Sequence, residues 1–235
     1  MKRAWLYQLR SWLVHGYTAS GGVLGFFALL AAVAGDPRQA FLLLMVAFFV
    51  DMTDGLLARW AKVSVHLPHF SGARLDDAID VFTYIYVPLF IIVQEALLPH
   101  SAWIIPPILA GLYAYGQSDM KTDDHYFLGF PSYWNVVALY LYWLAPGPVV
   151  AVFCVVVPAV LTVIPTRYLY PSRNGFLWKT NFILGGLWIL LVCTLLVQPE
   201  PNGALVWVSL AYPAFYMATS FYADWNERKG LARDC

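Results

Sequence analysis

Charge is the scarcest property of this sequence. Only 12% of its 235 residues are charged, against about a quarter in soluble domains, while 60% are hydrophobic and 17% are aromatic. So few charges cannot cover a water-facing surface, and a mean hydropathy of +0.63 excludes a disordered chain. The formal net charge is zero, which excludes the overall basic field of many nucleic-acid-binding proteins. The composition therefore indicates an integral membrane protein.

Cysteine is scarce as well. The three cysteines, Cys154, Cys193 and Cys235, are scattered and form no CxxC pair. Two of them lie within apolar runs. This pattern predicts neither a disulfide framework nor a zinc site.

The uncharged stretches predict how the chain crosses a membrane. A bilayer core needs about 20 apolar residues per helix, and uncharged runs of about this length cover 17–35, 101–118, 180–199 and 201–223. A longer run, 126–166, contains a turn signal at 145–148 and divides into two spans. Two shorter runs, 39–50 and 81–94, reach spanning length only if their helices continue through acidic residues. The sequence thus predicts an all-α polytopic membrane protein with about eight transmembrane helices in a single domain, 1–235.

The basic residues predict the orientation of these helices. Short cytoplasmic loops are enriched in Lys and Arg, and every Lys and Arg except Arg38 falls on one side of the predicted eight-span arrangement. The protein is therefore predicted to lie in the bacterial inner membrane, with both termini on the cytoplasmic side. Trp5, Leu9 and Trp12 recur at helical spacing between basic residues. Residues 1–15 thus predict an amphipathic interfacial helix rather than a cleaved signal peptide.

Four acidic residues interrupt the second and third predicted helices: Asp51, Asp54, Asp76 and Asp80. The first two are three residues apart and the last two are four apart, so each pair lies on one face of its helix. Antiparallel helices joined by a short cytoplasmic loop bring the two faces together. The four carboxylates are therefore predicted to meet in the cytoplasmic half of the bilayer.

This cluster predicts metal-dependent phosphate chemistry. Each buried carboxylate costs about 2.5–3.5 kcal/mol or more in hydrocarbon, so the group needs a counter-charge. All-oxygen ligation suits Mg²⁺ or Mn²⁺, and four carboxylates can hold two such ions. Gly55 and Ala58 leave the helix face bare, and the guanidinium of Arg59 matches a phosphate group. These features favour phosphoryl transfer on a lipid nucleotide over structural hydrogen bonding or ion transport.

The acidic stretch resembles the signature of the CDP-alcohol phosphatidyltransferases, D-x2-D-G-x2-A-R-x(n)-G-x3-D-x3-D. Every signature position is present between residues 51 and 80, with a spacer of twelve residues: Asp51, Asp54, Gly55, Ala58, Arg59, Gly72, Asp76 and Asp80. Segments 15–21, 84–88 and 127–135 are similar to the bacterial phosphatidylcholine synthases within this family. The resemblance implies CDP-diacylglycerol and choline as substrates, phosphatidylcholine and CMP as products, and a homodimer.

The same resemblance implies roles for individual residues. The four acids would bind one or two Mn²⁺ or Mg²⁺ ions, and Asp80 would also act as the catalytic base. Contacts to the CDP-lipid would come from Thr18, Gly55, Ala58, Arg59 and Gly72. For Thr18 the alternative is a hydroxyl that bonds to the backbone of its own helix.

Choline recognition calls for aromatic faces, because a quaternary ammonium offers no hydrogen-bond donor. The predicted choline contacts are Tyr84, Tyr133, Trp134 and Asn135, and the acidic residues Asp119, Asp123 and Asp124 precede the last three. The alternative is an aromatic belt at the membrane interface. A synthase that uses serine or another polar alcohol remains the alternative within the family, and a cation transporter is the alternative outside it.

Overall fold

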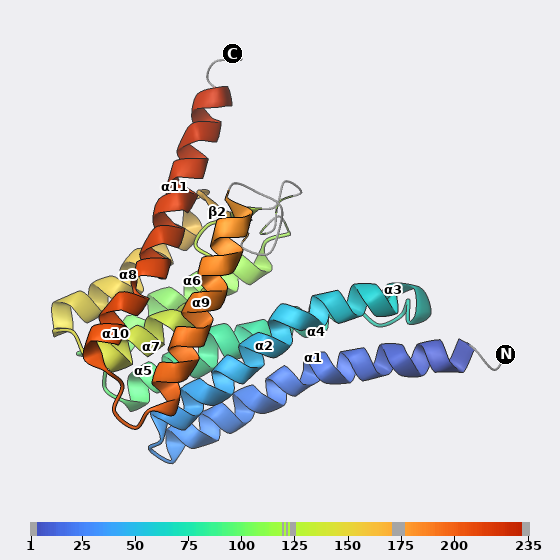
Figure 1. The fold of residues 1–235 in the computed structure, drawn as a ribbon, viewed down its shortest axis with the longest axis horizontal. Coiled ribbons are helices and arrows are strands. Elements are labelled where there is room, and N and C mark those ends of the chain that lie inside the picture. Colours follow the sequence, from blue (N-terminus) through green and yellow to red (C-terminus); the bar gives the residue numbers. More distant parts are fainter. Residues whose placement is uncertain (1–3, 119, 121, 123–125, 171–176, 232–235) are drawn as a thin grey trace. The chain divides into compact units, whose positions relative to one another are not determined.

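The computed structural model describes residues 4–118, 120, 122, 126–170 and 177–231 (Figure 1). Helices make up most of this part of the chain. They are α1 (Ala4–Val33), α2 (Pro37–Ala61), α3 (Val63–His66), α4 (Gly72–Asp80), η1 (Val81–Tyr86), α5 (Val87–Gln94), η2 (Ser101–Ile104), α6 (Ile105–Gly116), α7 (Trp134–Leu144), α8 (Pro148–Val163), α9 (Trp178–Val197), α10 (Gly203–Ser209) and α11 (Ala211–Leu231). Two short strands, β1 (Tyr126–Leu128) and β2 (Arg167–Leu169), complete the described elements.

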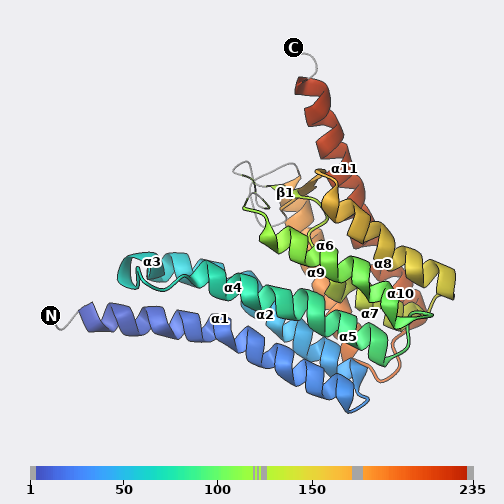
Figure 2. The same ribbon diagram turned by 180° about the vertical axis from the view of Figure 1, so that it is seen from behind.

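The chain divides into two compact units. The first contains residues 1–96 and 134–139, and the second contains residues 97–133 and 140–235. In the first unit, α1 packs along α2 and also contacts α3, α4, η1 and α5. Figure 2 shows α1 and α2 running side by side, with α3 near the N-terminal end of α1. The acidic residues of the signature all belong to this unit.

The N-terminal segment is the first part of α1. The sequence predicts an interfacial helix over 1–15 that precedes the first span, whereas the structure has one helix from Ala4 to Val33. Gly16 does not interrupt it, and the apolar side chains of Trp5, Leu9 and Trp12 are exposed. One glycine weakens a long apolar helix without ending it, so the segment continues directly into the first span, and its position at the membrane interface stays a prediction.

The helices predicted as the second and third spans, which correspond to α2 and to α4–η1–α5, continue through their acidic residues, as the sequence predicts. The side chain of Asp36 accepts a hydrogen bond from the Gln39 N–H at the start of α2, which then passes Asp51 and Asp54 and ends at Ala61. Ser71 caps α4 in the same way by accepting from the Arg74 N–H. Elements α4, η1 and α5 follow one another without a break from Gly72 to Gln94, with right-handed helical backbone at both junctions.

A π-helical turn, η1, lies directly after Asp80. At its end the Val87 N–H donates to the carbonyl of Phe82, five residues back. Pro88 gives a physical reason for the wider turn, because it has no N–H for the carbonyl of Tyr84 and its ring would crowd that carbonyl in an α-helix. The turn therefore relieves a conflict that an α-helix would contain.

The second unit departs from the predicted helices between residues 126 and 166. Strand β1 pairs with β2 in antiparallel fashion, with Phe127 opposite Tyr168, so α7 begins only at Trp134. Gly129 has a φ of +80°, and a Cβ there would lie 2.1 Å from the carbonyl oxygen of Thr162. Its N–H donates to the carbonyl of Thr166 instead of continuing a helix. The lack of charged residues between 126 and 166 could not reveal the turn at Gly129.

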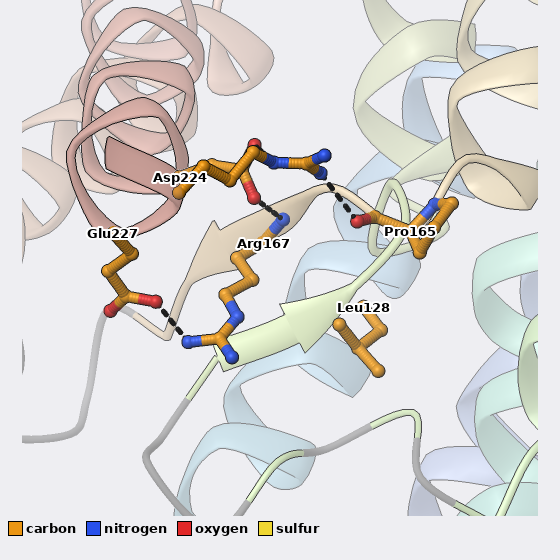
Figure 3. Close-up of a pocket in the computed structure, with 6 residues that line it drawn as sticks. Leu128, Pro165, Arg167, Asp224 and Glu227 are labelled. Carbon is orange, nitrogen blue, oxygen red and sulfur yellow. Dashed lines mark hydrogen bonds and ion pairs between the residues drawn. The ribbon is translucent and has the colours of Figure 1, made fainter. Parts of the chain in front are cut away.

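Charged side chains join β2 to α11 (Figure 3). The backbone N–H of Arg167 donates to Asp224 at 3.1 Å, and its guanidinium forms an ion pair with Glu227. Arg228 donates to the carbonyl of Pro165 at 2.9 Å. Burial raises the pKa of the nearby Tyr168 phenol to about 12, and the Asp224 carboxylate adds to this shift. Arg167 on β2 and Arg228 on α11 therefore hold these two elements together, besides any effect on membrane orientation.

Four stretches of the described chain are long and apolar enough to cross a membrane. They are Trp5–Val33, Pro37–Ala61, Trp178–Val197 and Gly203–Lys229. Helices α7 and α8 are apolar but have only 11 and 16 residues, short of the roughly 20 that a bilayer core requires. The structure is thus that of a helical membrane protein with four candidate spans, fewer than the eight predicted.

Glycines on α1 allow the continuous helix formed by α4, η1 and α5 to approach α1 closely. A Cβ on Gly25 would lie 2.8 Å from Cγ2 of Thr83 and 3.0 Å from the ring of Phe82. Gly22 lies on the same helix, but a Cβ there would meet Ile79 at an ordinary 3.5 Å. Gly25 is therefore the tightest point of the contact between α1 and η1.

We expect Gly25→Ala to destabilise the protein relative to Gly22→Ala. Both changes raise helix propensity equally, but only the first overpacks the interface, which typically costs about 1–3 kcal/mol. Thermal unfolding of the purified variants in one detergent measures the difference. Equal melting temperatures for the two variants would contradict the packing argument.

Candidate active site

Three of the four signature carboxylates come together in the structure. Carboxylate oxygens of Asp51 on α2 and of Asp76 and Asp80 on α4 all lie within 4.8 Å of one another. Ligand oxygens of Mg²⁺ lie about 2.0–2.1 Å from the ion, so opposed ligands are about 4 Å apart. Oxygen donors at this spacing fit a hard divalent cation, and the chemistry of the donor set therefore matches a metal of this kind.

The carboxylates border a narrow cavity within the first unit. It is lined by Thr18, Gly21, Ala47, Val50, Asp51, Asp54, Asp76, Ile79, Asp80 and Thr83. Its accessible volume of about 10 Å³ leaves room for about one water-sized sphere. The cavity thus has the size for an ion and is far too small for a nucleotide.

Asp54 lines this cavity together with the other three acids. Its side chain is buried, and it is not part of the group whose oxygens approach within 4.8 Å. The structure therefore brings Asp51, Asp76 and Asp80 together as predicted. Metal ligation by Asp54 stays a prediction.

Two of the residues predicted to contact the nucleotide, Gly55 and Arg59, lie close together on α2. Gly55 carries no side chain, and Nη1 of Arg59 lies only 3.4 Å from the position that a Cβ on Gly55 would take. The exposed guanidinium therefore folds back over the bare turn of α2. Thr18 lines the cavity, and its hydroxyl donates to the Val14 carbonyl at 3.4 Å, which is the backbone-bonded alternative. Contact between Thr18 and the nucleotide stays a prediction.

Gly72 is needed for close packing of α4 on α1. A Cβ at this position would lie 2.9 Å from Cε1 of His15, and His15 is only 4% exposed. Its imidazole packs 4.6 Å from the ring of Phe70, which limits its freedom to move aside. Gly72 therefore sets the position of the helix that carries Asp76 and Asp80.

Tyr84 contacts the carboxylate cluster rather than an open pocket. Its hydroxyl donates to Oδ2 of Asp51 at 2.7 Å, and the side chain is only 7% exposed. The sequence places Tyr84 one turn beyond Asp80 as a wall for choline. The structure shows a bond to a predicted metal ligand, which helical spacing alone could not reveal, and the contact with choline stays a prediction.

The remaining choline contacts are not tested by the structure and stay predictions. Trp134 is fully buried at the start of α7, and Oδ1 of Asn135 accepts from the N–H of Val136 at 2.9 Å. The ring of Tyr133 meets that of Tyr216, with 6.0 Å between centroids. The preceding acids, Asp119, Asp123 and Asp124, lie outside the described residues.

Sequence reasoning missed the supporting residues on α1. His15 packs against Gly72, Gly21 lines the cavity, and Gly25 contacts η1. The signal was present in the spacing of small residues at 18, 21 and 25, which places them on one face of the helix. Small residues on one face are typical of close helix packing in membranes.

The apolar helices and the carboxylate cluster between α2 and α4 place the chain among membrane proteins with a candidate divalent-metal site. No protein-family model matches the chain. Curated proteins do match it. The chain is 35% identical to the phosphatidylcholine synthase of Legionella pneumophila, covering 90% of this chain and 88% of that protein. It is 35% identical to the phosphatidylcholine synthase of Pseudomonas aeruginosa, covering 93% of each.

A third relative agrees with these two. The phosphatidylcholine synthase of Mesorhizobium japonicum is 36% identical, covering 89% of this chain and 75% of that protein. The chain therefore belongs to the phosphatidylcholine synthase family. This membership confirms the resemblance inferred from the signature residues.

We expect Gly72→Ala to weaken metal binding by displacing α4. A shift of the supporting shell of a metal site typically costs about 10–100-fold in affinity, so the Mn²⁺ dissociation constant of the purified variant should rise within this range. In a His15→Ala background, which removes the clashing ring, Gly72→Ala should have a much smaller effect. Independent, additive effects of the two changes would contradict a direct contact.

Proposed function

We propose that the chain condenses CDP-diacylglycerol with choline to give phosphatidylcholine and CMP. The observation that carries this proposal is the meeting of Asp51, Asp76 and Asp80, three signature acids, with oxygens within 4.8 Å. Membership of the phosphatidylcholine synthase family supports the choice of substrates.

The proposed cofactor is one or two Mn²⁺ or Mg²⁺ ions. Asp51, Asp76 and Asp80 would hold an ion, and Asp54 would take part in binding a second one. A bound cation would neutralise the negative charge of the diphosphate and the charge that spreads over the transferred phosphoryl group. Arg59, which folds over the bare turn at Gly55 and Ala58, would bind a phosphate oxygen of the CDP-lipid. Thr18 and Gly72 would border the nucleotide.

Asp80 is the proposed catalytic base. Its carboxylate accepts the proton of the choline hydroxyl while the oxygen of choline bonds to the lipid-side phosphorus. The bond from that phosphorus to the oxygen of CMP breaks, and CMP leaves. A carboxylate is a weak base for an alcohol, so proton transfer comes late, when the attacking oxygen has already become acidic.

Choline would be held by aromatic faces through cation–π contacts. Tyr84, Tyr133 and Trp134 are the proposed contributors of these rings, and the amide of Asn135 would orient the choline hydroxyl. The buried position of Trp134 means that a direct contact requires α7 to expose this ring when choline binds.

The proposed membrane arrangement keeps eight crossings. The helix from Gly72 to Gln94 counts as one of them, although α4, η1 and α5 are separate elements. Its 23 residues would extend roughly 34 Å at about 1.5 Å per residue, enough for a bilayer core. The first part of α1 would lie at the interface with its exposed Trp and Leu side chains. Both termini and the carboxylates would face the cytoplasm, and the protein would form homodimers.

The proposed function predicts CMP release that depends on choline and on a divalent cation. Purified protein is assayed with CDP-diacylglycerol and either choline or serine. Choline should be the better substrate, excess EDTA should abolish the reaction, and Mn²⁺ or Mg²⁺ should restore it. Faster release with serine would favour the serine-using alternative. Choline transport by vesicles without any CMP release would favour a transporter.

The base role of Asp80 predicts a large loss of rate in Asp80→Asn. General bases typically contribute about 10²–10⁴-fold, so turnover should fall by at least that lower figure at saturating Mn²⁺. Asp77→Asn is the matched control, because Asp77 is a neighbouring acid outside the signature, and it should retain most of the activity. A rate for Asp80→Asn above about a tenth of wild type would rule out the base role.

A further inference from the structure

Tyr84 meets α2 at two points. Its hydroxyl donates to Oδ2 of Asp51 at 2.7 Å, within the range of short bonds to a charged oxygen. Its ring stands edge-on to that of Phe48, with 6.5 Å between centroids. Phe48 precedes Asp51 by three residues, so both contacts fall on neighbouring turns of one helix face. The side chain of Tyr84 is therefore anchored beside the carboxylate.

The π turn places Tyr84 on the face of the two acids of α4. An α-helix advances about 100° per residue, so residues four apart drift by about 40° per step. In a regular α-helix Tyr84 would lie about 80° around from Asp76. A π turn has more residues per turn, so each residue rotates less and Tyr84 returns to the line of Asp76 and Asp80. Element η1 follows Asp80 directly, which is where this correction is required.

We infer that Tyr84 is a positioning residue that orients the Asp51 carboxylate for the metal ion. This inference rests on the metal centre of the proposed function. With Oδ2 held by the Tyr84 hydroxyl, the carboxylate cannot rotate freely, and its orientation toward Asp76 and Asp80 is set before an ion arrives. A tyrosine suits this task because it donates a hydrogen bond without bringing a positive charge that would compete with the cation.

The bond also stabilises the cluster without a cation. Each carboxylate raises the energy of the other two by repulsion, and a hydrogen bond to the charged form lowers that energy without neutralising it. Residues that orient a metal ligand typically change metal affinity or activity by about 10–100-fold when removed. Tyr84 should act through Asp51 in this way, with no direct part in the chemical step.

The test compares Tyr84→Phe with Tyr86→Phe. Both variants lose one hydroxyl from the same π turn, but Tyr86 is 43% exposed, which makes it a matched control. Mn²⁺ binding is measured without substrate, from the electron paramagnetic resonance signal of free Mn²⁺. Tyr84→Phe should raise the Mn²⁺ dissociation constant by about 10–100-fold, whereas Tyr86→Phe should stay within about twofold of wild type.

A kinetic split adds a second measurement. In the CMP-release assay the half-saturating Mn²⁺ concentration of Tyr84→Phe should rise, while the rate at saturating Mn²⁺ should fall much less. Wild-type Mn²⁺ affinity in Tyr84→Phe, or equal losses in both variants, would overturn the inference and leave the metal centre standing. Failure of the wild type to bind Mn²⁺ would overturn the metal centre and the inference with it. Tight Mn²⁺ binding without choline-dependent CMP release would overturn the substrate assignment alone.

Discussion

The mutual repulsion of Asp51, Asp76 and Asp80 is the constraint on which the first unit depends. Two unit charges 4 Å apart repel by about 4 kcal/mol at an effective dielectric constant of about 20, and the three carboxylates approach within 4.8 Å. Packing of the helices must oppose this repulsion until a cation offsets it. A cluster of like charges therefore needs a rigid support. Any ion that binds only the folded protein should in turn stabilise it.

That support comes from helix α1, which carries no ligand of its own. Helices in a bilayer gain little from hydrophobic association, so close packing of small residues must hold them together. Gly25 against Thr83, and Gly72 of α4 against His15, are contacts that a single Cβ would disrupt. Gly72 and Gly25 thus have one physical purpose. They let the backbones approach until the carboxylates of two helices reach a common point.

The sequence predicts the acidic helices well and the region from residue 126 to residue 166 poorly. Helical spacing and the need for a counter-charge are local properties, so continuous helices through Asp51 and Asp80 could be predicted. The strand pair β1–β2 depends on a turn at Gly129 and on hydrogen bonds between distant segments, which an uncharged run does not encode. The bond from Tyr84 to Asp51 depends on the smaller rotation per residue in η1. A prediction from sequence spacing uses the same rotation for every helical residue, so it cannot place Tyr84 correctly after a π turn.

The size of the cavity limits where a lipid nucleotide can lie under the proposed function. The space among the carboxylates is about that of one water-sized sphere, so a diphosphate cannot enter it whole. Only phosphate oxygens could reach ions held there, while the nucleotide would lie outside the cavity, along the face of α2 that carries Gly55. That face is open at Gly55, where no side chain intervenes and the guanidinium of Arg59 lies close. The narrow cavity would therefore exclude the bulk of the substrate, and the bare turn at Gly55 would leave room for it.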